Sequence, residues 1–194
     1  MLRNTELSYG SVAKWLHWIV ALCFLGAYCT YYIPHWIIDT ADPRDPGLRL
    51  AREYHVAIGL SVLVWASLRI VWKFINPEPE LSPMPNWQHQ SSKAMHWVLY
   101  FFMFAMPITG WMGYGGDVHY GIFQIPRFRE SGLGLWILET FNVEWRVWEQ
   151  PWDYFHKTIS GAWVLWILIA IHAGAALYHH FVQKDNVLIG TLSF

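Results

Sequence analysis

Residues 158–183 read TISGAWVLWILIAIHAGAALYHHFVQ, a run of 26 residues without Asp, Glu, Lys or Arg. A helix needs roughly 20 mostly apolar residues to cross about 30 Å of hydrocarbon. The run therefore predicts a membrane-spanning helix over 158–183. One ionisable side chain, His172, lies deep inside it.

Three further runs meet the same criterion, at residues 15–38, 54–72 and 94–116. Arg69 is the only charge inside any of the four runs, and it is close enough to a helix end to reach the interface. The pattern predicts an all-α integral membrane protein, a four-helix bundle with up-down-up-down order. We expect residues 1–194 to form a single transmembrane domain.

The composition supports a membrane protein and excludes some functions. Among the 194 residues, 55% are apolar and 14% are charged, about half the charged share of a soluble domain. The net charge is −1 and no basic block is present, which argues against nucleic-acid binding.

The two cysteines give no sign of a covalent site. Cys23 and Cys29 lie in one helical run about 120° apart, so they cannot bridge within it, and we expect two buried thiols. No Cys-x-x-Cys-His sequence is present, which excludes covalent attachment of a c-type haem, and a zinc site built from paired cysteines is likewise excluded.

The connections hold nearly all the proline and acidic residues. Residues 77–85 carry four prolines and predict an extended linker. The connection 117–157 is rich in aromatic residues and predicts a cap on the membrane surface. Four of the five lysines (Lys14, Lys73, Lys93 and Lys184) lie on the side of the two termini, which favours cytoplasmic termini.

Histidines are unusually frequent, and six of the ten lie in or beside the predicted spans: His17, His55, His96, His156, His172 and His179. Ionisable groups at this depth are rare and usually functional, because an unpaired polar atom in hydrocarbon is costly. A neutral imidazole can bind iron, and two imidazoles from different helices can hold a haem between them.

Antiparallel order pairs four of these histidines. His55 and His156 share the membrane face of the long connections, whereas His172 is displaced toward the level of His17. Sixteen residues separate His156 from His172, roughly 24 Å along a helix axis, which would stack two cofactors across the bilayer as an electron path.

The same interval leaves His156 and His172 about 160° apart on an ideal helix. We therefore expect a π-bulge between Gly161 and His172, a regular helix that starts only after His156, or ligands directed at different neighbouring helices.

The remaining histidines and Gly59 have simpler interpretations. A lone histidine in a membrane helix more often only hydrogen-bonds a neighbouring helix. His96 has no evident partner and is expected to be a packing or interfacial residue. His179 and His180 are expected at the interface, with a quinone contact as the alternative. Gly59, one turn past His55, would let a flat macrocycle or a helix approach.

Basic residues near each level are candidate partners for haem propionates: Arg3, Lys14, Arg69 and Lys184 on the terminal side, and Arg44, Arg49, Arg52 and Lys157 on the other.

Several motifs together resemble the bacterial cytochrome b-561 family. They are IHAGAALYHH at 171–180 followed by QKDNVL at 183–188, LHW at 16–18, His55 with Gly59, and MPITG at 106–110. The resemblance implies a bacterial inner-membrane cytochrome with two non-covalent b haems, ligated by His17 with His172 at the cytoplasmic side and by His55 with His156 at the periplasmic side. It also implies electron exchange with ubiquinone, and one branch of the family oxidises superoxide.

Three functional hypotheses follow. The first is a self-sufficient oxidoreductase joining quinone to a small one-electron donor such as superoxide, which Arg44, Arg49 and Arg52 would attract although nearby acidic residues weaken their field. The second is an electron-relay or anchor subunit of a larger respiratory or dehydrogenase complex. The third is a haem-free bundle that carries metal ions with the same histidines.

Overall fold

The computed structural model describes residues 1–6, 8–40, 42, 44–79 and 84–185. Helices make up nearly all of its regular structure. The elements are α1 (Ser11–Ile37), α2 (Pro46–Ile75), α3 (Asn86–Gly113), β1 (Val118–His119), β2 (Gln124–Ile125), a 3₁₀ turn (Phe128–Glu130), α4 (Gly132–Thr140), α5 (Trp145–Asp153), a π-helical segment (Tyr154–Val164), α6 (Leu165–Tyr178) and a last π-helical turn (His179–Gln183). From α5 onward these elements form one continuous helix, Trp145–Gln183, here called the last helix.

Three of the helices are long and apolar enough to cross a membrane: α1, α2 and the last helix. The prediction of helical membrane spans is confirmed for these three. The predicted span 94–116 forms the apolar part of α3, but α3 begins eight residues earlier with the mostly polar residues 86–93. These polar turns set α3 apart from the other long helices.

Several helices begin well before the predicted spans, so the helices are longer than the apolar runs that predicted them. The α2 helix starts at Pro46, where the Asp45 side chain accepts hydrogen bonds from the backbone N–H groups of Gly47 and Leu48. The last helix starts at Trp145, thirteen residues before the predicted span and within the predicted connection. Hydropathy marks only the part of a helix that lies in hydrocarbon, whereas backbone bonding and caps decide where it ends.

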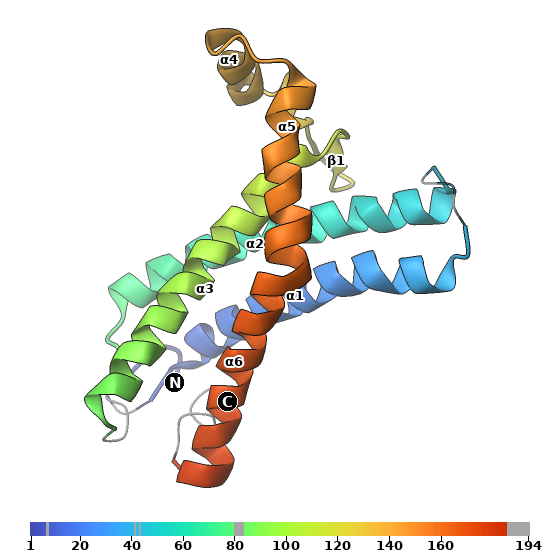
Figure 1. Cartoon of the computed structure of the whole chain (residues 1–194). Helices are drawn as coiled ribbons and strands as arrows, with labels where there is room; N and C mark the ends of the chain where they lie inside the picture. Colours follow the sequence, from blue (N-terminus) through green and yellow to red (C-terminus); the bar gives the residue numbers. More distant parts are fainter. Residues whose placement is uncertain (7, 41, 43, 80–83, 186–194) are drawn as a thin grey trace.

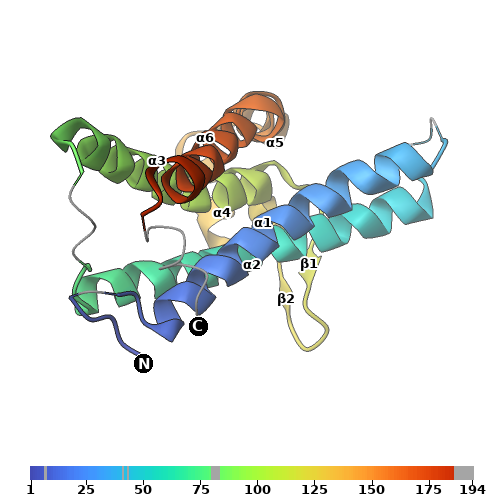
Figure 2. The ribbon, with the colours of Figure 1, turned by 90° about the horizontal axis from the view of Figure 1, so that it is seen from below.

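The long helices form two crossing layers. The antiparallel helices α1 and α2 lie side by side in both views, and α3 lies against the last helix, which returns in the opposite direction (Figures 1 and 2). One buried cluster joins α1, α2 and α3 through Val20, Val62, Ala66, Tyr100 and Met103. A second joins α3 to the last helix through Phe102, Met106 and Leu165.

The connection between α3 and α5 folds into a cap at the end of the molecule away from the N-terminus and from the end of the last helix (Figure 1). Its hairpin is fastened to α2, because the Tyr120 hydroxyl donates to the Ala57 carbonyl at 2.7 Å. Asp117 accepts from the backbone N–H of Arg127 at 3.0 Å, and this bond holds the pKa of the Asp117 carboxyl below its usual value. The cap is therefore ordered by polar bonds as well as by its aromatic residues.

Two smaller expectations concern the cysteines and the linker. Cys23 and Cys29 are free thiols, as predicted, and both are half-buried. In the proline-rich connection, residues 80–83 lie outside the described part of the chain, and the Pro77 carbonyl accepts a hydrogen bond from the Asn4 side chain.

Candidate functional site

The structure brings His55 and His156 together at the end of the bundle near the cap. Their ring centres are 6.0 Å apart and the rings are nearly perpendicular. His55 Nδ1 lies 2.7 Å from the Ala27 carbonyl oxygen, and His156 Nδ1 lies 2.9 Å from that of Met106. A carbonyl only accepts hydrogen bonds, so each ring carries its proton on Nδ1 and leaves the Nε2 lone pair free for a metal. We call this couple the outer pair.

The structure also brings His17 and His172 together, near the other end of the bundle. Their ring centres are 6.3 Å apart at an interplanar angle of 57°. This inner pair meets Arg69, whose Nη1 donates to His17 Nδ1 at 2.6 Å and whose guanidinium lies 5.7 Å from the centre of the Tyr100 ring. Arg69 therefore lies at the inner site, as the sequence suggested, but its present partner is a histidine.

Arg69 bears directly on whether His17 can bind a metal. A His17 ring that accepts at Nδ1 carries its proton on Nε2, which is the wrong tautomer for ligation through Nε2. Ligation requires the proton on Nδ1, and Arg69 would then be released. Among the described residues no carboxylate lies within ion-pair distance of Arg69, so its charge would be available to an anion.

A π-helical segment explains how His156 and His172 can lie on the same face of the last helix. It covers Tyr154–Val164, so eight of the sixteen steps between these histidines are π-helical. Bonding from residue i to i+5 turns the chain by about 80° per residue, against about 100° in an α-helix. Eight such steps remove about 160° and return both rings to the same face of the last helix.

This finding corrects the expected place of the irregularity. We expected a π-bulge between Gly161 and His172, but the segment includes His156 and ends at Val164. Most of it therefore precedes Gly161. The alternative in which regular helix starts only after His156 is also wrong, because α5 lies before it.

His96 has a close partner, contrary to the prediction. Its ring centre lies 5.4 Å from that of His172, at an interplanar angle of 78°. His96 belongs to the first half of α3, and antiparallel order puts the start of a third span at the membrane face where the first span starts. The antiparallel order of the spans could therefore have predicted that His96 lies near the level of His17.

Glycines border the histidine pairs. A Cβ atom added to Gly59 or Gly174 would meet no atom within 4 Å, so open space lies beside both. Gly110, which sequence reasoning did not connect with a histidine, is pressed against the outer pair: its Cβ would lie 2.8 Å from His156 Cε1. A glycine at position 110 therefore lets the ring of His156 approach α3.

At the end of the last helix His179 is paired with Asp185. The atoms His179 Nδ1 and Asp185 Oδ2 are 2.6 Å apart, and both side chains are largely buried. Lys184 adopts a left-handed conformation, with φ of 55°, that turns the chain back after the helix and brings Asp185 to His179. The carboxylate fixes the proton on Nδ1 and leaves His179 Nε2 free.

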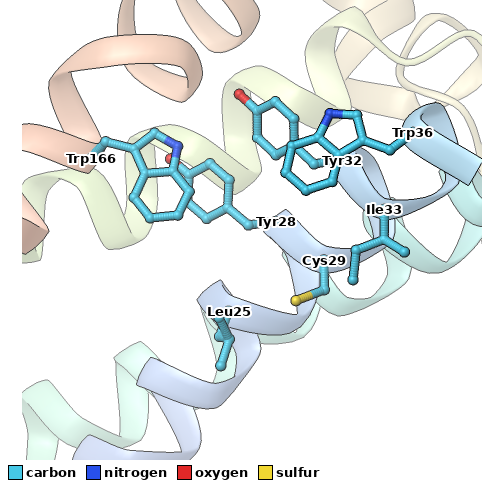
Figure 3. A pocket seen from close by; sticks show the side chains of 7 residues that line it. All are labelled: Leu25, Tyr28, Cys29, Tyr32, Ile33, Trp36 and Trp166. Carbon is cyan, nitrogen blue, oxygen red and sulfur yellow. The ribbon is translucent and has the colours of Figure 1, made fainter.

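An apolar groove of about 430 Å³ follows the outer half of α1 where it meets Trp166 (Figure 3). Tyr28 and Trp166 are in contact at its inner end, with ring centres 4.4 Å apart. The Tyr28 hydroxyl already donates to the Gly161 carbonyl at 3.0 Å. The groove thus offers mainly hydrocarbon and aromatic surface, on the exposed side of two candidate spans.

Both imidazole pairs fit an iron porphyrin. An iron atom bound to two imidazoles at about 2 Å each sets their ring centres about 6 Å apart. The outer pair also has the tautomers that ligation needs, whereas the inner pair needs the rearrangement of Arg69. Within the described residues, no group of three or more His, Cys, Asp or Glu side chains is placed to hold a metal ion.

Comparison with known proteins identifies the family. The family model described as prokaryotic cytochrome b561 matches residues 8–190. The chain belongs to the prokaryotic cytochrome b561 family. Membership implies haem b, electron transport and membrane helices, which confirms the resemblance seen in the sequence and sets aside the haem-free metal carrier.

Curated relatives are similar over nearly their whole length. Cytochrome b561 homolog 1 of Escherichia coli K12 is 31% identical over 181 residues, which cover 90% of this chain and 91% of the relative. Cytochrome b561 homolog 2 of the same organism is 26% identical over 95% of this chain and 91% of its own. The protein named "Probable superoxide oxidase CybB" of Yersinia pestis is 23% identical over 93% of each chain.

Replacing Gly110 should disturb the outer pair selectively. The Gly110→Ala variant would push the His156 ring away from α3, so we expect the haem content per chain to fall by at least a quarter, measured as the pyridine haemochrome. Gly115→Ala, whose added Cβ meets no atom within 4 Å, should leave the content unchanged. Equal haem content in the two variants would contradict this role of Gly110.

Proposed function

We propose that this cytochrome b561 family protein is a four-helix, diheme b-type cytochrome that moves single electrons across the bilayer. Its fourth span is α3, which from Ala94 onward is apolar and packs against both α2 and the last helix. Residues 1–194 form one transmembrane domain. The order of the spans is up-down-up-down, and the membrane is the bacterial inner membrane.

The observation that carries this proposal is the presence of two imidazole pairs with ring centres 6.0 and 6.3 Å apart. In the proposal, His55 with His156 and His17 with His172 are the axial ligands of two non-covalent b haems. Eight π-helical and eight α-helical steps place the two levels roughly 20 Å apart along the last helix.

A haem held by two imidazoles from these helices would supply one-electron redox chemistry. The chain contributes orientation: the carbonyls of Ala27 and Met106 hold the outer rings by their Nδ1 protons. Gly59 leaves room for the macrocycle beside His55. Arg69, released from His17, pairs with a haem propionate at the inner site.

Haem counting on single histidine variants tests the ligand set. We expect the wild-type protein to bind two b haems per chain, and His17→Ala, His55→Ala, His156→Ala and His172→Ala each to bind about one. The measurement is pyridine haemochrome absorbance per chain. His89→Ala, at an exposed position of α3, is the control and should keep both haems. Any of the four that keeps two haems is not a ligand.

We further propose that ubiquinone exchanges electrons at the inner end, with His179 as its hydrogen-bonding partner. The largely buried pair with Asp185 leaves the Nε2 atom of His179 available, seven residues beyond His172 on the same helix. A buried imidazole with an oriented free nitrogen suits a quinone carbonyl. In this proposal the inner end of the bundle, on the side of the termini, faces the cytoplasm, as the lysine distribution favours.

Loss of that imidazole should slow exchange with quinone. We expect His179→Ala to reduce the rate of haem reduction by ubiquinol about tenfold, without loss of haem, in stopped-flow absorbance measurements. His180→Ala, which removes the adjacent histidine, is the matched control. Similar rates in both variants would move the quinone contact away from His179.

Superoxide is the candidate electron donor, because a relative of similar length carries the name "Probable superoxide oxidase CybB". Arg44, Arg49 and Arg52 are exposed at the start of α2, at the same end of the bundle as the outer pair, and would attract an anion. Mixing oxidised protein with superoxide should therefore reduce its haem at least ten times faster than an unrelated bis-histidine cytochrome. An equal rate would remove superoxide from the proposal.

An electron-relay or anchor subunit of a larger respiratory or dehydrogenase complex is the second candidate function. The specific observation in its favour is the cap helix α4, where several apolar side chains are about half exposed or more. They are Leu133, Leu135 and Trp136, followed by Phe141 just past the helix end. A partner subunit would bury this surface, and so would the membrane interface.

A further inference from the structure

The inner and outer axial histidines differ in how their second ring nitrogen is satisfied. Both outer rings donate Nδ1–H to backbone carbonyls. His17 meets Arg69. Within the described part of the chain, no hydrogen bond to a backbone or carboxylate oxygen is found for His172. A metal-bound imidazole almost always donates its other N–H, because that bond fixes the ring and raises its basicity.

His96 is the side chain placed to accept that hydrogen bond. A neutral imidazole carries a proton on only one ring nitrogen, so the other nitrogen of His96 can accept a hydrogen bond. Its ring centre lies 5.4 Å from that of His172. Two imidazoles joined by an N–H···N bond of about 2.9 Å have ring centres about 5 Å apart.

We propose that His96 accepts the Nδ1–H of His172 when the inner haem is bound, and thereby positions the axial ligand. We call this proposed hydrogen bond, from His172 on α6 to His96 on α3, the relay. This inference rests on the proposed ligation of the inner haem by His172. His96 itself is a positioning residue that does not touch the iron.

The relay has a measurable consequence for the inner haem. An acceptor at Nδ1 increases the negative character of the ligating imidazole, which favours ferric over ferrous iron. Removing the acceptor should therefore raise the reduction potential of the inner haem and leave the outer haem unchanged. The rotation of the His172 ring also sets the low-spin ferric signal of that haem.

The test compares His96→Leu, which removes the acceptor, with His96→Gln, whose side-chain carbonyl can still accept. Spectroelectrochemical titration and low-temperature electron paramagnetic resonance are recorded on the haem-loaded protein in detergent. In His96→Leu, we expect the reduced-to-oxidised ratio of one haem at a fixed applied potential to rise roughly tenfold, with a shift of one ferric signal. His96→Gln should restore most of both, and His89→Leu on the same helix should change neither.

Two results would overturn the proposal. In the first, His96→Leu leaves both potentials and both ferric signals as in the wild type. In the second, His96→Gln shows the same change as His96→Leu, either in reduction potential or in haem content. That result would assign His96 to packing or to direct ligation. If His96→Leu does not fold, a His96→Gln protein with two haems and wild-type potentials supports the relay.

Haem counting on His172→Ala tests the proposed ligand set independently of the relay. The ligand set fails for the inner haem if His172→Ala keeps two haems, whatever the behaviour of the His96 variants. A His172→Ala protein with one haem, together with unchanged potentials in His96→Leu, leaves the ligand set intact and removes only the relay.

Discussion

An imidazole between membrane helices has two ring nitrogens, and hydrocarbon can satisfy neither. At the outer pair, His55 donates a hydrogen bond from Nδ1–H to the Ala27 carbonyl, and His156 donates one to the Met106 carbonyl. A carbonyl in the middle of a helix already accepts one backbone bond and has a second lone pair to offer. This bonding leaves the Nε2 lone pair of each ring available, and the distance between the ring centres matches an iron atom with two nitrogen ligands. The same two bonds fix the tautomers of both rings.

The last helix carries one histidine of each pair, so its twist is a second constraint. Eleven residues of π-helix change the backbone bonding between Tyr154 and Val164, and this segment returns His156 to the face of His172. Tyr28 of α1 donates to the Gly161 carbonyl in the same segment, and its ring lies against Trp166 just beyond it. The aromatic residues that line the apolar groove therefore also fasten the π-helical segment to α1.

Sequence reasoning located the helices and the four paired histidines, because uncharged runs and antiparallel order act over the whole length of a span. It missed the start of the last helix at Trp145, since charges outside hydrocarbon do not end a helix. It misplaced the π-helical segment, because an interval of sixteen residues requires a change of twist without saying where the change occurs. It also assigned His96 to packing or the interface, and it did not connect Gly110 with a histidine. Both act through neighbours on another helix, and such contacts depend on how the helices rotate about their axes.

The two pairs differ in what holds them, and this difference bears on how one chain could set two potentials. The outer rings are held by backbone carbonyls, which no substitution of the carbonyl residue itself removes. The inner rings instead contact side chains. His17 accepts a hydrogen bond from Arg69, and the ring of His172 lies beside that of His96. A guanidinium near a haem favours the reduced, less positive iron, whereas an acceptor on the axial imidazole favours the oxidised form. In the proposed diheme protein, the inner site would therefore combine two opposing side-chain influences on one haem, whereas the outer site would have only backbone partners.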